Sequence, residues 1–159
     1  MLQINYVSSR RNLGVISSFQ ACGFNYLCIM RIALVQQNYH IGHFEKNTQK
    51  ILEAIQQARL DRADLVVFTE LCICGYPPRD FLEFTDFINR SYESIESIAR
   101  HTHGIGVIIG APVVNPEKEG KDLYNAALLL EDGKISGSAF KSLLPTYDVF
   151  DEYRYFEPS

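Results

Sequence analysis

Residues 65–80, LVVFTELCICGYPPRD, contain a short apolar run followed at once by a carboxylate and a turn. The run at 65–68 is too short for a helix and rich in valine, which is typical of a strand buried on both faces of a parallel sheet. Glu70 follows where this strand is expected to end, and residues 75–78 turn the chain. Ligands of open α/β sheets bind beyond the carboxyl ends of the strands, so Glu70 is a candidate for chemistry.

The chain on either side of this stretch alternates between strand and helix patterns. A β-type run at 31–36 and a one-sided apolar pattern over 44–58 precede the strand at 65–69, which predicts a parallel β-α-β unit with a right-handed crossover. Asp80 and Glu83 have the spacing of a capping box, so a helix is expected from there to about residue 100. Further strands are expected at 106–110, 123–130 and 134–140, the last two joined by a hairpin turn at 132–133.

Length and composition indicate one globular domain with a sizeable core. The net charge of −4 is mild and the basic residues are scattered, so we expect neither nucleic acid nor an acidic membrane surface as a partner. The cysteines and histidines lack the spacing of a disulfide scaffold or of a metal site, which predicts no metal and a reducing, cytoplasmic location.

The first 29 residues are expected to form a separate extension of unknown role. The segment that begins at Met30 looks like the start of a domain, which would run over residues 30–159. The alternative is that the extension adds a further strand or helix to that domain.

Two charged residues, Glu70 and Lys141, each stand at the end of a predicted strand. The pattern alone leaves two interpretations open. They could share a catalytic cavity, or they could be solvated side chains or a structural ion pair, as most surface carboxylates and lysines are.

Three segments resemble a known family. They are FTELCICGYPPRDFL at 68–82, YNAALLLEDGKI at 124–135 and KSLLPTYDVFDEYRYFEP at 141–158. They look like the nitrilase-type carbon–nitrogen hydrolase domain that serves as the N-terminal glutaminase of glutamine-dependent NAD⁺ synthetases. The resemblance implies an α-β-β-α sandwich, of which this chain supplies the N-terminal portion only. Thr69 departs from the proline common before the Glu, and Asp148 from a common glycine.

The resemblance also implies roles for four residues. Glu70 would be the general base and Lys141 the ammonium that stabilises the oxyanion, while Tyr147 would contact the substrate and Glu152 would support Lys141. For Tyr147 the alternative is a buried aromatic, and for Glu152 an exposed carboxylate beside Arg154.

The third member of the family's triad is a cysteine downstream of Ser159, so we expect the chain to be a truncated portion without glutaminase activity. Cys72 and Cys74 are expected to be small apolar residues packed beneath the strand end.

The function that the resemblance implies is hydrolysis of glutamine, with ammonia passing to a downstream synthetase domain of the same polypeptide that amidates deamido-NAD⁺. No cofactor is expected in this segment, whereas ATP and magnesium are implied for the absent synthetase domain. A homo-oligomer is expected. The alternatives are a stand-alone carbon–nitrogen hydrolase acting on a small amide and a non-catalytic assembly module that keeps the fold.

Overall fold

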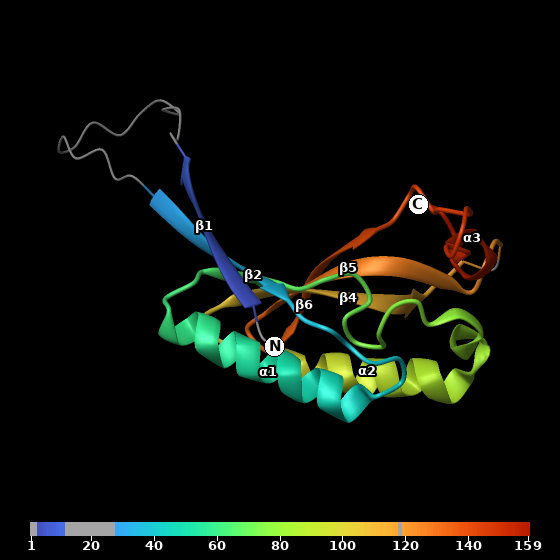
Figure 1. The fold of residues 1–159 in the computed structure, drawn as a ribbon, viewed down its shortest axis with the longest axis horizontal. Coiled ribbons are helices and arrows are strands. Elements are labelled where there is room, and N and C mark those ends of the chain that lie inside the picture. Colours follow the sequence, from blue (N-terminus) through green and yellow to red (C-terminus); the bar gives the residue numbers. More distant parts are fainter. Residues whose placement is uncertain (1–2, 12–27, 118) are drawn as a thin grey trace.

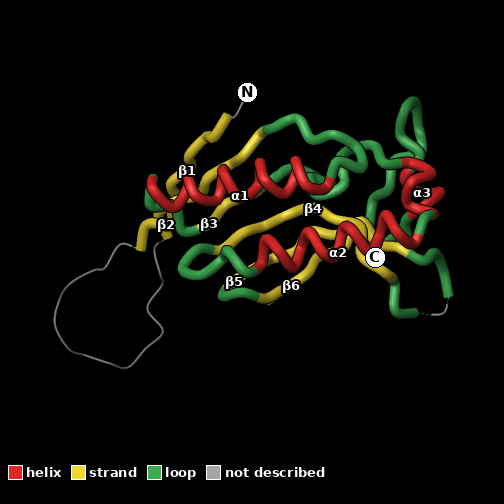
Figure 2. The backbone as a smooth tube through the Cα atoms, turned by 90° about the horizontal axis from the view of Figure 1, so that it is seen from below, coloured by secondary structure: helices red, strands yellow, loops and turns green. Residues whose placement is uncertain are grey.

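The computed structural model describes residues 3–11, 28–117 and 119–159. In these ranges the chain forms a six-stranded sheet whose strands lie in sequence order, β1 to β6. Helices α1 and α2 cover one face of the sheet (Figure 1). Figure 2, seen from the helix side, shows the two helices side by side in front of the sheet, running roughly along the direction of β4 to β6. None of the helices in the described ranges is long and apolar enough to cross a membrane.

The sheet combines a parallel centre with antiparallel edges. Strand β1 (Gln3–Arg11) is antiparallel to β2 (Cys28–Gln36), and β2, β3 (Leu65–Val67) and β4 (Gly106–Val114) are parallel to one another. Strands β5 (Leu123–Glu131) and β6 (Lys134–Phe140) complete the sheet as antiparallel neighbours. The helices are α1 (Phe44–Leu60), α2 (Thr85–Ala99) and the short α3 (Glu152–Tyr155), with a 3₁₀ turn η1 at Arg79–Glu83.

The core lies between the helices and the sheet. Alternate residues of the strands point toward the helices, and the helices contribute residues at helical spacing. The fully buried side chains of this layer include Ile51, Ile55, Val66, Ile95, Ile98, Val107, Ile109 and Leu130. Burying one such aliphatic side chain contributes about 1.5–3 kcal/mol, so this single layer accounts for much of the folding free energy.

The parallel β-α-β unit predicted around α1 is confirmed, because β2 and β3 pair in parallel from Ile32 opposite Leu65 to Leu34 opposite Val67. Two bounds differ. Strand β3 ends at Val67, so Glu70 lies in the following turn. Strand β4 continues past the predicted end to Val114 and includes Pro112. The proline is tolerated because β3 pairs with β4 only as far as Ile108, which leaves β5 as the neighbouring strand beyond it.

The predicted capping box is wrong. Residues Arg79–Glu83 form a 3₁₀ turn, and α2 starts separately at Thr85 with Phe84 as its N-cap and no side-chain cap hydrogen bond. The Asp80 carboxylate instead accepts a hydrogen bond from the Tyr155 hydroxyl, far along the chain. The Asp80 carboxylate, which the local spacing assigned to a helix cap, therefore accepts a long-range hydrogen bond instead.

The N-terminal extension is described only in part. Residues 3–11 form β1, which pairs with β2 along its whole length, so the described part of the extension adds a strand to the sheet. Residues 1–2 and 12–27 of the predicted extension lie outside the described ranges.

The turn that carries Glu70 lies directly against β4 at Gly110. A Cβ atom at this glycine would come within 2.4 Å of the Leu71 nitrogen and 2.9 Å of Glu70 backbone atoms. The absence of a side chain at Gly110 is therefore what lets the turn approach the sheet.

We expect Gly110→Ala to lower the free energy of unfolding by about 1–3 kcal/mol, because backbone atoms must move to admit the methyl group. Gly137→Ala is the matched control, since the nearest atom to a Cβ there is 3.8 Å away. Urea unfolding followed by circular dichroism measures both. Equal stabilities for the two variants would contradict this account of the turn.

Candidate active site

Glu70, Asn125 and Lys141 meet at one end of the sheet, brought there by three different elements. Asn125 Nδ2 donates to Glu70 Oε1 at 2.6 Å, and the Lys141 backbone N–H donates to the Asn125 carbonyl at 2.9 Å. Asn125 on β5 therefore holds Lys141 through its backbone and Glu70 through its side chain. Nothing in the described part of the chain donates a hydrogen bond to Glu70 Oε2, which leaves this oxygen available to accept a proton.

The Lys141 ammonium lies between two carboxylates. Its Nζ is 2.8 Å from Glu70 Oε1 and 2.8 Å from Glu152 Oε2. The Glu152 side chain is only 6% exposed, against 43% for Glu70. The ion pair with Glu152 is therefore less screened by water than the pair with Glu70. This geometry contradicts the alternative in which Glu152 is an exposed carboxylate beside Arg154.

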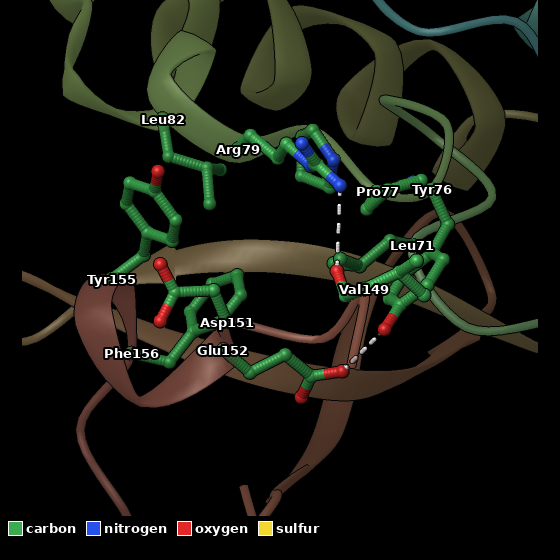
Figure 3. A pocket seen from close by; sticks show the side chains of 11 residues that line it. Leu71, Tyr76, Pro77, Arg79, Leu82, Val149, Asp151, Glu152, Tyr155 and Phe156 are labelled. Atoms are coloured by element: carbon green, nitrogen blue, oxygen red, sulfur yellow. Dashed lines mark hydrogen bonds between the residues drawn. The ribbon is translucent and has the colours of Figure 1, made fainter. Parts of the chain in front are cut away.

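The second oxygen of Glu152 also has a partner. The Tyr76 hydroxyl donates to Glu152 Oε1 at 2.8 Å, and Figure 3 shows this hydrogen bond between two residues that line the same small pocket. Asn125 Nδ2 lies 3.5 Å from Glu152 Oε2. A buried carboxylate is costly unless such donors surround it, and here they come from separate segments.

The two carboxylates determine the charge of Lys141. Partial burial lowers the pKa of the Lys141 ammonium, but the hydrogen bonds to Glu152 and Glu70 and their negative charges outweigh burial, so its pKa lies above the ordinary value. The side chain therefore remains a cation throughout the physiological range.

The turn that holds Glu70 is tied to the neighbouring loop by a buried amide. Asn47, fully buried on α1, donates to the carbonyls of His40 and Ile73 and accepts from the His40 N–H. Gly75 adopts φ +82, and a Cβ there would meet the Ile41 backbone nitrogen at 2.6 Å. These contacts fix the turn on the scaffold, which fixes the backbone of Glu70.

Two open hollows meet at Lys141. One, of about 780 Å³, lies on the sheet face without helices and includes Glu70 and Asn125. The other, of about 990 Å³, includes Tyr147. Tyr147 is 68% exposed and packs its ring edge-on against Phe150, so the structure contradicts the buried alternative for this residue. Asp148, which the resemblance places where a glycine is common, adopts φ +55, the left-handed conformation that glycine tolerates best.

The two cysteines beside Glu70 are fully buried, as predicted. The Cys72 thiol donates to the Gly110 carbonyl at 3.7 Å, and burial raises its pKa to about 12. Burial raises the pKa of the Cys74 thiol as well. Neither thiol lines a hollow with Glu70 or Lys141, so both are poor candidates for a nucleophile.

Sequence reasoning missed Asn125 and Tyr76. Asn125 is a polar residue near the start of a largely apolar strand, and that anomaly was a usable signal. Tyr76 had no comparable signal, because its partner Glu152 is 76 residues away. Among the described residues no group of three or more His, Cys, Asp or Glu side chains is arranged to hold a metal ion.

Comparison with known proteins gives a consistent set of relatives. The carbon–nitrogen hydrolase family model matches residues 31–159. A glutamine-dependent NAD⁺ synthetase of Thermotoga maritima is 39% identical over 129 residues, which cover 81% of this chain and 22% of the relative. The Synechocystis sp. enzyme of the same name is 43% identical over 129 residues, covering 79% of this chain and 23% of the relative. The chain thus spans less than a quarter of the length of these relatives.

Solved structures agree with these relatives. The glutamine-dependent NAD⁺ synthetase of Acinetobacter baumannii, in complex with ADP, superposes with a TM-score of 0.74 at 35% identity, over 80% of this chain and 24% of that one. An amidase from Nesterenkonia sp. superposes with a TM-score of 0.66 at 27% identity, over 82% of this chain and 48% of that one.

Iodoacetamide at pH 8 is expected to leave Cys72 and Cys74 unmodified in the folded chain and to label both in urea, because burial removes access and disfavours the thiolate. Peptide mass spectrometry reports each site separately. Rapid labelling of either cysteine without denaturant would show that these thiols are accessible and would contradict their assignment to the core.

Lys141→Met is expected to lower the free energy of unfolding by about 2 kcal/mol at pH 8, because it leaves the buried Glu152 without its cation. The pKa of Lys141 is raised in the folded state, so its contribution is complete below the unfolded value of about 10.4 and is lost as the pH rises through the folded value. The stability difference between wild type and variant should therefore be constant from pH 8 to 10 and shrink above that range.

Urea unfolding at several pH values measures this difference. Lys134→Met, at an exposed lysine that forms no ion pair in the described part of the chain, is the control. A Lys141 contribution that grew with pH would refute the assigned ion pairs.

Proposed function

The chain belongs to the carbon–nitrogen hydrolase family and has a nitrilase-superfamily fold, and from this premise we propose that its site hydrolyses the side-chain amide of glutamine. The observation that carries the proposal is the Lys141 ammonium held at 2.8 Å from both Glu70 and Glu152 at the edge of an open hollow. A fixed cation beside a carboxylate with one free oxygen can supply the oxyanion partner and the general base for attack on an amide.

Glu70 and Lys141 have complementary parts in this chemistry. Glu70 Oε2 takes the proton of a nucleophilic thiol, whose sulfur attacks the amide carbon. Negative charge then develops on the amide oxygen, where the Lys141 ammonium stabilises it. The tetrahedral adduct collapses as Glu70 returns the proton to the leaving nitrogen, so ammonia departs and a thioester remains. Water attacks the thioester while Glu70 takes its proton, which releases glutamate and restores the thiol.

The nucleophile in this proposal is a cysteine beyond Ser159, as in the family. Cys72 and Cys74 are excluded from the role by their burial and raised pKa. Residues 1–159 alone are accordingly proposed to lack glutaminase activity. Tyr147 is proposed to contact glutamine, since it is exposed in the hollow that it shares with Lys141.

The ammonia is proposed to serve ATP-dependent synthesis of NAD⁺ from deamido-NAD⁺ in a downstream domain of the same polypeptide. Support comes from the relatives, which are glutamine-dependent NAD⁺ synthetases, and from the bound ADP in the Acinetobacter baumannii structure. ATP and magnesium would bind in that downstream domain and take no part in the steps assigned to Glu70 and Lys141.

A second candidate is hydrolysis of a small amide by a stand-alone enzyme. The Nesterenkonia amidase favours it, because the chain covers 48% of that structure. Glutamine remains the better candidate, since the synthetases are more similar in sequence than the amidase is.

A hybrid enzyme tests the proposal. The 129 aligned residues of the Thermotoga maritima relative are replaced by those of this chain, and glutamate release and NAD⁺ formation are measured. The hybrid should use glutamine in preference to acetamide. Glu70→Gln and Lys141→Met should each lower kcat/KM for glutamine at least about a thousandfold, because the base or the oxyanion partner is lost.

NAD⁺ formation from added ammonium chloride is the control and should be unaffected, since that reaction bypasses the glutaminase site. Full glutamine hydrolysis by the Glu70→Gln hybrid, or by residues 1–159 alone, would contradict the assignment. Preference for acetamide would favour the stand-alone amidase.

A further inference from the structure

We propose that Tyr76 is a positioning residue, whose hydroxyl holds the Glu152 carboxylate on Lys141 and thereby aims the Lys141 ammonium at the reacting oxygen. Tyr76 belongs to the turn that also carries Glu70, whereas Glu152 belongs to the segment that follows Lys141. Their 2.8 Å hydrogen bond therefore joins the two parts of the chain that supply the acid and the amine. This inference rests on the proposed function.

Glu152 needs such a contact because α3, the helix that carries it, is too short to hold its side chain in place. Helix α3 is one turn long, from Glu152 to Tyr155, and a helix of this length is not stable without outside contacts. The Glu152 backbone N–H donates to the Pro145 carbonyl at 3.1 Å, which fixes the start of the turn but leaves the side-chain torsions free. Contacts to the carboxylate itself must determine its direction.

Within the described ranges, Tyr76 is the uncharged residue that donates the shorter hydrogen bond to the Glu152 carboxylate. The other donors are Lys141, the group to be positioned, and Asn125 at 3.5 Å, a distance at the limit of a hydrogen bond. Lysine has a flexible four-carbon stem, so its ammonium takes the position that its carboxylate partners dictate. Glu70 is one such partner but is 43% exposed, which leaves the buried Glu152 as the firmer of the two.

The pocket behind Glu152 supports this function of Tyr76. Apolar side chains line it, among them Leu71, Leu82 and Phe156, and Figure 3 shows the Tyr76 hydroxyl meeting the carboxylate from the side opposite Phe156. Leu71 and Phe156 are almost completely buried, so this part of the pocket wall offers the carboxylate no side-chain hydrogen-bond donor.

Tyr76 also connects this anchor to the loop of Tyr147. The rings of Tyr76 and Phe150 lie 6.2 Å apart between centroids, and those of Phe150 and Tyr147 lie 5.5 Å apart. An aromatic series thus runs from the proposed substrate contact to the group that positions Lys141. Burial, and next the hydrogen bond to Glu152, raise the pKa of the Tyr76 phenol, which keeps the hydroxyl a donor.

Site-resolved lysine acylation of the 159-residue chain tests the proposal without any need for activity. Acetyl N-hydroxysuccinimide is used at pH 8, and mass spectrometry compares Lys141 with Lys134 in the same digest. In Tyr76→Phe, Lys141 should react about threefold faster or more than in wild type, because its carboxylate partner is no longer held. Tyr155→Phe is the matched control. Tyr155 lines the same pocket, but its hydroxyl donates to the exposed Asp80. Its removal should leave the acylation rate of Lys141 unchanged.

The reciprocal measurement uses Glu152→Gln, so it decides even if Tyr76→Phe does not fold. Loss of the negative charge of Glu152 should lower the pKa of Tyr76. NMR of chains labelled at tyrosine Cζ measures this pKa. An unchanged Tyr76 pKa in this variant, or an unchanged Lys141 acylation rate in Tyr76→Phe, would overturn the proposal.

Kinetics of the hybrid enzyme separate positioning from substrate contact. Tyr76→Phe should lower kcat for glutamine about tenfold with KM within about twofold, because the hydroxyl acts through Lys141. A raised KM with unchanged kcat would overturn the proposal and make Tyr76 a substrate contact. A hybrid inactive with all wild-type residues would refute the proposed function, whereas the acylation result would still decide whether Tyr76 holds Glu152.

Discussion

The site depends on one constraint, which is that a single ammonium, that of Lys141, lies between two carboxylates of unequal burial. The buried Glu152 fixes the cation, while the more exposed Glu70 keeps one oxygen free of hydrogen bonds from the described residues. The same ammonium thus neutralises a buried charge and faces an open hollow. Its raised pKa, which results from both carboxylates, keeps it charged for either purpose.

The sheet brings these groups together from distant parts of the sequence. Strands β3 and β4 are parallel, whereas β5 and β6 are antiparallel. The turn after β3, the start of β5 and the end of β6 therefore lie at the same end of the sheet. Gly110 allows the Glu70 turn to lie against β4, and Asn125 joins Glu70 to the Lys141 backbone. The scaffold therefore positions the site chiefly through backbone packing.

The local sequence pattern predicted that Glu70 and Lys141 follow strands. It could do so because strand length, valine content and the helical stripe of α1 are properties of neighbouring residues. It failed where a partner lies far away in the sequence. Asp80 was assigned to a capping box, yet its carboxylate accepts from Tyr155, 75 residues later. The Tyr76–Glu152 hydrogen bond spans 76 residues and has no local signature. The functional roles came from the family resemblance, since spacing alone could not separate catalysis from an ordinary ion pair.

The most direct measurement of the central claim is ¹H–¹⁵N NMR of the Lys141 ammonium, with detection of scalar couplings across its hydrogen bonds to side-chain carboxyl carbons. The account predicts a slowly exchanging ammonium signal coupled to the carboxyl carbons of both Glu70 and Glu152. An Nζ signal that exchanges rapidly with water and shows coupling to neither carboxylate would contradict it.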